Sequence, residues 1–400
     1  MIFKPELIKG IAKTSHPYGC RKEVLNQIEY CKNAKQFHGP KKVLIIGASS
    51  GFGLATRISL AFGGAKADTI GVSFETGITD RRTGTAGWYN NIFFKEFAEK
   101  EGLIAKNFIG DAFSDEVKEN VIKYIKNEFG KIDLLIYSLA SPRRKDPKTG
   151  NIYDSTLKTT SGEFQGPTID METDELVTTK VNSATDKEIE ATKKVMGGED
   201  WSEWCKLLLE NDCLSDKAIT ISYSYIGASR TYKIYREGTI GEAKRHLENT
   251  AIQIDKEWQK KINGKAFVSV NKAIVTKASA YIPSFSLYAA VLYKVMKEKN
   301  LHENCIMQMQ RMFADKIYAE NLLEFDDSGR LRMDDWELRE DVQSEVNELW
   351  EKITPDNFKI LSDYDGYKKE FMQLNGFEID GVNYSEDIDI EALKRLEPET

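Results

Sequence analysis

The feature that most constrains the fold is a strand, a glycine-rich turn and a helix in direct succession. Residues 43–53 read VLIIGASSGFG, and the first five positions hold no polar side chain. Such an uninterrupted apolar strand is typical of a parallel sheet covered on both faces. Glycines allow a tight turn and a close approach to a pyrophosphate, which the N-terminus of the next helix attracts. The pattern predicts a dinucleotide site formed by Gly47, Ala48, Ser49, Ser50, Gly51, Phe52 and Gly53.

The alternation of strands and helices continues along the chain and predicts the fold class. The periodicity predicts helices over 54–63, 90–102 and 114–130, and strands over 69–75, 104–111 and 132–142. Further elements are expected as helix 197–210, strand 218–225, helix 238–261 and strand 266–276, with helices over 284–299, 303–320 and 336–353. This order predicts an α/β fold with a doubly wound parallel sheet of the Rossmann type.

The chain has no Pro/Gly/Ser-rich linker, so one large domain over 1–400 is expected. Residues 41–142 and 197–300 form its dinucleotide-binding core in this interpretation. The alternation of strands and helices stops at 143–196, and an insertion of this length is usually functional. We therefore expect residues 143–196 to cover the active site at the carboxyl edge of the sheet. Residues 301–400 are expected to form a helical C-terminal extension.

Charge and cysteine content exclude several classes of protein. The net charge is −7 and the pI is about 5.5, so nucleic acid is not an expected partner. The five cysteines are widely spaced without a CxxC motif, which argues against a disulfide framework or a metal site and favours a reducing cytoplasm. The apolar segment 279–296 contains Pro283 and Lys294 and is too interrupted to be a good membrane span.

Residues at the ends of three predicted strands extend the cofactor site. Glu75 lies 22 positions after Gly53, where a carboxylate can bind the adenosine ribose hydroxyls and repel a 2′-phosphate. This predicts NADH rather than NADPH, although Arg81 and Arg82 follow in the loop. Asp111 and Ala112 lie where the adenine would bind, or Asp111 only organises the turn into the next helix. Close approach of the nicotinamide ribose is expected at small residues of the run Ser138, Leu139 and Ala140.

Tyr235 and Lys244 follow the fifth strand of the core and are separated by eight residues. A lysine ammonium beside a tyrosine favours phenolate character, which makes proton donation easier during hydride transfer. Glycines 238 and 241 suggest that Tyr235 precedes the helix that contains Lys244. Tyr225, at the end of the strand, either contacts a substrate carbonyl or is a core tyrosine. We interpret two other pairs, Tyr293/Lys297 and Tyr364/Lys368, as surface helix pairs.

These motifs occur together with others that carry a family resemblance along nearly the whole chain. They include HPYGC (16–20), GASSGFGLATR (47–57), SYSYIG (222–227), GTIGEAK (238–244), DDWEL (334–338) and NGFEIDGVNY (375–384). The chain resembles the short-chain dehydrogenase/reductase superfamily, whose usual spacing is Tyr-x3-Lys. Its Tyr-x8-Lys spacing resembles that of the trans-2-enoyl-CoA reductases, also called FabV-type enoyl reductases.

The resemblance implies NADH-dependent reduction of the trans-2 double bond of an enoyl thioester, in fatty acid synthesis or butyrate formation. It implies Tyr235 as proton donor, Tyr225 as the substrate carbonyl contact, and a monomer. Implied cofactor contacts are Ala48 to Gly53, Phe74, Glu75, Asp111, Ala112, Leu139, Ala140, Lys244, Ile274, Val275 and Thr276. Coenzyme A and acyl carrier protein both remain open as the acyl carrier. Helix 284–299 either walls the acyl pocket or packs in the core. The alternatives are an NADH-dependent carbonyl reductase of the short-chain dehydrogenase type and a redox-sensing scaffold.

Overall fold

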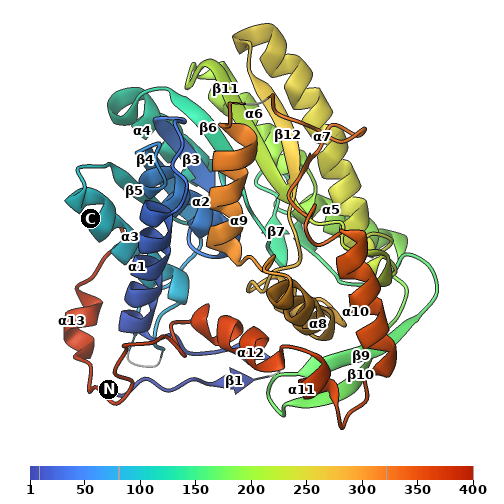
Figure 1. Ribbon diagram of the computed structural model, residues 1–400. Coiled ribbons are helices and arrows are strands. Elements are labelled where there is room, and N and C mark those ends of the chain that lie inside the picture. The colour runs from blue at the N-terminus through green and yellow to red at the C-terminus, as the bar shows by residue number, and fades with distance from the viewer. Residues whose placement is uncertain (9, 80–81, 321, 400) are drawn as a thin grey trace.

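Seven parallel strands form the central sheet of the protein (Figure 1). The structure is a computed structural model that describes residues 1–8, 10–79, 82–320 and 322–399. Their spatial order is β13-β12-β11-β6-β3-β4-β5. The bounds are β3 Lys42–Ile46, β4 Asp68–Ser73, β5 Ala105–Ile109, β6 Ile132–Tyr137, β11 Leu214–Ser224, β12 Lys265–Val270 and β13 Leu331–Arg332. The order reverses between β3 and β6, which confirms the doubly wound class.

Helices cover both faces of the sheet because its strand residues are apolar in both directions. Val43 and Ile45 pack toward one layer, and Leu44 and Ile46 toward the other, all fully buried. The first layer is formed by α1 Pro17–Asn33, α2 Gly51–Phe62, α3 Ala86–Lys100 and α9 Cys305–Arg311. The second is formed by α4 Asp115–Tyr124, α6 Glu199–Glu210 and α7 Thr239–Ile262. The expected core elements are present, with ends displaced by a few residues.

Two helices expected as continuous differ in their last turn. The helix predicted over 114–130 changes at Ile125–Phe129 into a π-helical turn, and the one over 303–320 does so at Met312–Ile317. The first turn ends at Gly130, whose φ of 84° favours glycine. Strand β13 was not expected, because two residues are too few to show a periodic pattern.

The segment 143–196 contains two antiparallel hairpins and a helix, which its weak periodicity did not predict. They are β7 Arg143–Lys145 with β8 Ile152–Asp154, β9 Phe164–Asp170 with β10 Glu175–Val181, and α5 Asp186–Met196. Strand β9 is fastened to helix α8 (Phe285–Glu298), because Ser286 Oγ accepts from the Ile169 N–H at 2.9 Å. The second hairpin therefore lies beside the helix that follows the sheet (Figure 1).

The last part of the chain packs around α8 and returns to the N-terminus. Its helices are α10 Glu340–Lys352, α11 Phe358–Leu361, α12 Tyr364–Gln373 and α13 Ile390–Lys394, and the short strands β1 Leu7–Ile8 and β2 Ile11–Ala12 pair near the start. Side chains from α8, α10 and α12 share one apolar cluster. The backbone of Ile388 bonds to that of Met1 in both directions, at 3.1 and 2.7 Å. The two ends of the chain are thereby joined.

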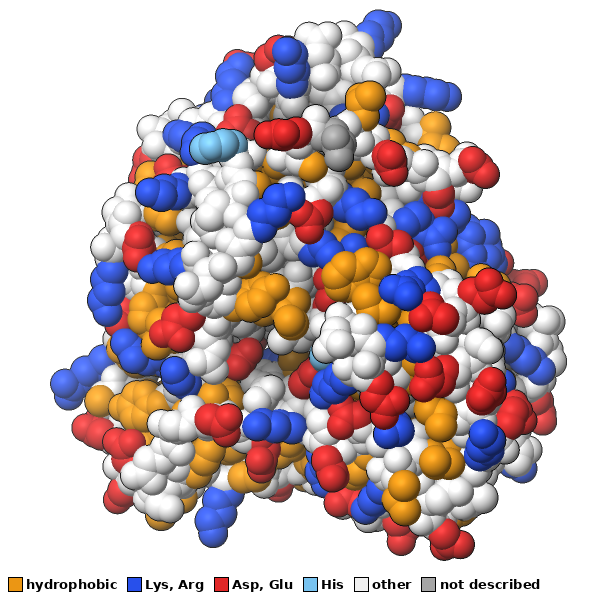
Figure 2. All heavy atoms as spheres, viewed as in Figure 1, with side chains coloured by type: hydrophobic (Ala, Val, Ile, Leu, Met, Phe, Trp, Pro, Cys, Tyr) orange, Lys and Arg blue, Asp and Glu red, His pale blue; other side chains and the backbone are white. Residues whose placement is uncertain are grey.

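Surface charge is mixed rather than segregated. Figure 2 shows Lys and Arg side chains interspersed with Asp and Glu over the visible face. In the part of the chain that the structure describes, no helix is long and apolar enough to cross a membrane. All five cysteines are free thiols, four of them buried.

Candidate active site

The glycine-rich turn between β3 and α2 has a geometry that other residues could not adopt. Gly47 and Gly51 have φ values of 86° and 53°, in the region that favours glycine. A side chain at Gly53 would collide with the carbonyl oxygen of Gly47, and one at Gly47 with that of Ser138. Ser50 is the N-cap of α2 without a side-chain cap bond. The helix N-terminus therefore retains N–H groups for an anion.

Glu75 lies against this turn rather than in bulk solvent. Its Oε1 accepts a hydrogen bond from Ser49 Oγ at 2.5 Å. A side chain at Gly87, in the first turn of α3, would collide with the Glu75 carboxylate. Neighbouring Phe74 is 78% exposed, with an open ring face. The structure thus brings Glu75 and Ser49 together at the edge expected for the adenosine ribose, whereas Arg81 lies outside the described residues.

The segment 274–276 lies across from the glycine turn and is held by hydrogen bonds. Ser279 Oγ accepts from the Thr276 N–H at 2.8 Å and donates to the Ile274 carbonyl at 2.9 Å. The Val275 N–H donates to Tyr293 Oη at 2.9 Å. Ser50, Gly51, Ile274 and Val275 help to line one cavity of about 70 Å³. Two separate loops therefore meet at the carboxyl ends of β3 and β12.

The surface interpretation of the two other tyrosine–lysine pairs was wrong for both tyrosines, whereas the side chains of Lys297 and Lys368 are 41% and 30% exposed. Tyr293 and Tyr364 are 0% and 2% exposed, because both helices pack against the C-terminal segment. The hydroxyl of Tyr293 fixes the backbone at Val275, so this tyrosine supports the candidate cofactor loop. Spacing alone could not reveal that role, since the partner is a backbone group 18 residues away.

The strand ends at β5 and β6 complete the crevice. Asp111 Oδ1 accepts from the Phe113 N–H at 3.0 Å, so this carboxylate does organise the turn into α4. The Ala112 carbonyl accepts from Trp204 Nε1 at 3.2 Å. Leu139 is half-buried and Ala140 is exposed, beside the Ser138 carbonyl that contacts the glycine turn. All these residues lie at the carboxyl edge, although hydrogen bonds tie Asp111 and Ala112 to α4 and α6 rather than to the glycine turn.

Tyr235 precedes α7 and Lys244 lies within it, as expected from the glycines between them. Both side chains are buried, at 6% and 9% exposure. Lys244 Nζ donates to the Tyr223 carbonyl at 3.0 Å, and burial lowers the pKa of this lysine to about 8. Burial raises the pKa of Tyr235, which is opposite to the expected shift toward phenolate. The lysine ammonium is directed at the Tyr223 backbone, so desolvation dominates at the phenol.

Tyr225 and Tyr235 line one pocket. Their rings meet edge to face, with centroids 4.7 Å apart. The pocket has a volume of about 200 Å³ and is largely apolar, with walls from β9, the residue after β11, the turn before α7, and α8. Its lining includes Phe164, Pro167, Tyr225, Tyr235, Phe285 and Tyr288. Only the first turn of α8 contributes, because Leu287 and Val291 point into the core. An extended apolar group can therefore enter beside two phenol hydroxyls.

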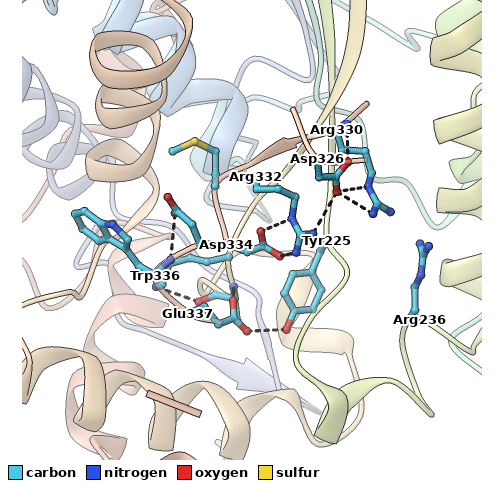
Figure 3. Close-up of polar contacts among 12 residues, drawn as sticks. Tyr225, Arg236, Asp326, Arg330, Arg332, Asp334, Trp336 and Glu337 are labelled. Atoms are coloured by element: carbon cyan, nitrogen blue, oxygen red, sulfur yellow. Dashed lines mark hydrogen bonds and ion pairs between the residues drawn. The ribbon is translucent and has the colours of Figure 1, made fainter. Parts of the chain in front are cut away.

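The sequence interpretation missed Tyr288, which lines this pocket, and Glu337, which lies behind two of its tyrosines. Glu337 is fully buried, and its carboxylate lies 2.7 Å from Tyr288 Oη. It also lies 3.4 Å from Tyr225 Oη (Figure 3). Glu337 lies in the motif DDWEL, and the only indication in the sequence was an acidic residue between the apolar residues Trp336 and Leu338. No local rule connects that motif to a tyrosine more than a hundred residues away.

The residues present fit a dinucleotide such as NADH. The glycine positions leave no room for a β-carbon, the α2 N-terminus lacks a side-chain cap, and Glu75 is positioned at the second strand end. Together, fold and site define an α/β oxidoreductase of the Rossmann type.

Comparison with known proteins assigns the chain to a family within that class. Residues 82–318 match the model of the trans-2-enoyl-CoA reductase catalytic region, and residues 2–80 match the NAD(P)H binding domain of trans-2-enoyl-CoA reductase. The chain therefore belongs to the trans-2-enoyl-CoA reductase family. It is 70% identical over 398 residues to a Clostridium acetobutylicum protein named trans-2-enoyl-CoA reductase (NADH), covering 100% of both chains. It is 54% identical to a Photobacterium profundum enoyl-acyl-carrier-protein reductase (NADH), covering 99% and 100%.

Solved structures agree with this assignment. The crystal structure of the Clostridium acetobutylicum trans-2-enoyl-CoA reductase in complex with NADH matches with a TM-score of 0.99, at 70% identity and 100% coverage of both chains. The Treponema denticola trans-2-enoyl-CoA reductase in complex with NAD matches with a TM-score of 0.93, at 48% identity, covering 97% and 98%.

A third family model, described as an enoyl reductase FAD binding domain, matches residues 325–388. The residues there do not fit that group. No glycine occurs between Arg330 and Asp365, so the strand β13 is not followed by a phosphate-binding turn. The helices bury their apolar faces against α8. A cavity lined entirely by this segment carries Asp341, Glu345 and Glu348 beside a single cation, Lys352, and this excess of negative charge would repel a diphosphate.

Proposed function

We propose that this protein reduces the trans-2 double bond of enoyl thioesters with NADH, giving the saturated acyl thioester. The observation that carries the proposal is the pocket in which Tyr225 and Tyr235 face an apolar cavity at the carboxyl end of β11. Family membership along nearly the whole chain supports the same reaction. NADH supplies the hydride when bound, and negative charge then develops on the thioester oxygen.

The chain's own residues have separate tasks in this reaction. Tyr225 donates a hydrogen bond to the thioester oxygen, where a preorganised donor stabilises developing charge. Tyr235 delivers the proton that completes the saturated product. Lys244 holds the cofactor ribose with its ammonium group. The apolar walls exclude water, which strengthens these polar interactions.

We assign the cofactor site to the strand ends described above. The glycine turn and α2 hold the pyrophosphate, Phe74 and Glu75 the adenosine, Asp111 and Ala112 the adenine edge, and Leu139 and Ala140 the nicotinamide ribose. The backbone at Ile274, Val275 and Thr276 faces the nicotinamide. Support comes from the convergence of these loops at one sheet edge.

The division of the chain and its setting are part of the proposal. Residues 41–142 and 197–300 act as the dinucleotide core, residues 143–196 cover the pocket, and residues 301–400 brace it, all within one domain. We also propose a cytoplasmic monomer that accepts coenzyme A or acyl-carrier-protein thioesters. The free cysteines support the location, and relatives named for both carriers support the substrates.

The direct test is oxidation of NADH by the purified protein with crotonyl-CoA. Turnover is expected with NADH and reduced or absent with NADPH, because Glu75 repels a 2′-phosphate. Acetoacetyl-CoA serves as the control substrate. Activity on acetoacetyl-CoA but not on crotonyl-CoA would replace the proposal by a carbonyl reductase. Binding of NADH without turnover of any enoyl thioester would indicate a non-catalytic protein.

A further inference from the structure

Glu337 connects the C-terminal segment to two parts of the active site, the residue Ala273 before the candidate cofactor loop and the pocket residue Tyr225. It lies in the loop between β13 and α10 and is 0% exposed. One carboxylate oxygen accepts from the Ala273 N–H at 2.7 Å, directly before the candidate cofactor loop. The other accepts from Tyr288 Oη at 2.7 Å. The same oxygen lies 3.4 Å from Tyr225 Oη (Figure 3). This buried carboxylate is held by three protein partners, and the proposed hydride transfer assigns it no role.

The number of protons that these hydroxyls can donate limits the hydrogen bonds that Tyr225 can make. A phenol has one proton to donate, and an ionised carboxylate can only accept. While Glu337 is ionised, the Tyr225 proton is drawn to the carboxylate and away from a ligand. Tyr288 cannot take over the Tyr225 role, because it donates its own proton to Glu337 and accepts from Gln343 Nε2 at 3.2 Å. When Glu337 is protonated, its O–H can donate to Tyr225, and the Tyr225 proton becomes free for the substrate.

We propose that Glu337 is a positioning residue that decides whether the Tyr225 hydroxyl donates its proton to the protein or to the thioester oxygen. The inference rests on the proposed enoyl reduction. In the active arrangement the protonated Glu337 donates to Tyr225 Oη, and Tyr225 donates to the oxygen on which charge develops. No proton leaves Glu337, so the step changes only the direction of two hydrogen bonds. The α-carbon still receives its proton from Tyr235.

The surroundings of Glu337 favour the protonated acid near neutral pH. Burial raises the pKa of Glu337 to about 7, although the Ala273 N–H and Tyr288 Oη act in the opposite direction. Asp334 on the same segment also raises the pKa, and its charge is largely matched by Arg332 at 2.7 Å. Lys272, which follows β12, lowers it. The protonated form therefore exists below about pH 7 and is lost as pH rises.

The substitution Glu337→Gln tests the proposal through a pH profile. Its amide oxygen can accept from Ala273 while its NH₂ donates to Tyr225, which keeps at every pH the donor that the protonated acid presents to Tyr225. For the wild type with saturating NADH and varied crotonyl-CoA, kcat/KM for crotonyl-CoA should fall with a midpoint near pH 7. In the variant that midpoint should move to about pH 8, where Lys244 loses its proton. An unchanged midpoint in the variant would overturn the inference.

Glu303→Gln is the matched control. Glu303 is another buried glutamate of the C-terminal region, but its carboxylate binds Arg311 at 2.6 Å rather than a tyrosine. Loss of this ion pair should lower Tm and leave the midpoint of kcat/KM near pH 7. A shift equal to that of Glu337→Gln would mean that general loosening of the C-terminal segment is responsible, and the assignment to Glu337 would fail.

Tyr225→Phe provides a test that does not depend on the folding of Glu337→Gln. Without the Tyr225 hydroxyl, the proton on Glu337 has no route to the substrate oxygen. The residual kcat/KM of Tyr225→Phe should lose the midpoint near pH 7, and adding Glu337→Gln should change it less than twofold. A persistent midpoint near pH 7, or additive losses in the double variant, would contradict the coupling. Absence of wild-type turnover with any enoyl thioester would instead overturn the proposed function, and this inference with it.

Discussion

The cofactor edge and the acyl pocket lie at the same end of the sheet but are built differently. The cofactor edge depends on backbone: glycines at 47 and 53 that leave no space for side chains, and N–H groups at the start of α2. The acyl pocket depends on side chains from β9, α8, α10 and the segment that follows β11. Two of its tyrosines, Tyr225 and Tyr288, share a carboxylate that lies 112 and 49 residues away from them along the chain.

This difference distinguishes the part of the site that is proposed to bind the cofactor from the part that is proposed to react with the substrate. Backbone turns are determined by nearby residues and tolerate few substitutions. Side-chain hydroxyls are oriented by distant partners, so single atoms can be removed while the fold persists. The cofactor edge should therefore respond to variants by losing affinity, and the acyl pocket by losing turnover.

The largest expected effect lies in the acyl pocket. Tyr235→Phe should lower kcat by about 100- to 1000-fold, because a hydroxyl donor aimed at the reacting centre is lost. The Kd for NADH should stay within about twofold, since the ring remains. Steady-state turnover and fluorescence titration of NADH measure the two. Tyr232→Phe, in the same turn but outside the pocket, is the control. Near-normal turnover of Tyr235→Phe would remove this tyrosine from the mechanism.

The strongest effect at the cofactor edge is expected from Gly53→Ala. The new β-carbon would collide with the Gly47 carbonyl, and moving that backbone costs about 3 kcal/mol, or about 100-fold in the Kd for NADH. Gly102→Ala is the control, since its φ is 77° with no atom within 4 Å of a β-carbon. It should lower stability by about 1 kcal/mol and leave NADH binding unchanged. Titration calorimetry with NADH compares the two, and equal affinities would show that the turn is not a pyrophosphate site.

Lys244→Met should affect both the cofactor edge and the acyl pocket. Loss of a charged donor should weaken NADH binding by about 10- to 30-fold and lower turnover as well. In the protein with Lys244 intact, activity should fall further as pH rises through about 8, beyond the decline near pH 7 assigned to Glu337, because burial lowers the pKa of this lysine and only its protonated form is charged. Binding titrations and a pH profile of kcat/KM test both points. Unchanged NADH affinity in Lys244→Met would contradict its assignment to the cofactor ribose.

The smallest of these effects is expected at Glu75. Glu75→Gln removes the negative charge but keeps a group that can bond to Ser49. The ratio of kcat/KM for NADPH to that for NADH should rise by about tenfold, because repulsion of the 2′-phosphate is relieved. Parallel assays with the two cofactors measure it. If the ratio stays constant, cofactor selection resides elsewhere, and the ribose role of Glu75 must be abandoned.

The same contrast explains how much could be predicted from the sequence. The sheet, its helices and the strand ends at Gly47, Glu75 and Asp111 follow from local periodicity and turn chemistry. The hairpin at 164–181 and strand β13 were not expected, because short elements have weak patterns. Tyr293 was assigned to the surface although it is buried, since its partner is a backbone N–H in another loop. Glu337 could not be assigned a role, because its meaning depends on contacts made only in three dimensions.

The joining of the two chain ends has a consequence for biosynthesis. The backbone of Met1 is bonded to Ile388, and Glu337 reaches Tyr225 only when β13 has added to the sheet edge. A nascent chain still held in the ribosome tunnel can form the glycine turn but lacks the carboxylate behind Tyr225. Synthesis must therefore pass well beyond Glu337 before the pocket is complete, and a product truncated before residue 325 should lack the carboxylate that orients Tyr225.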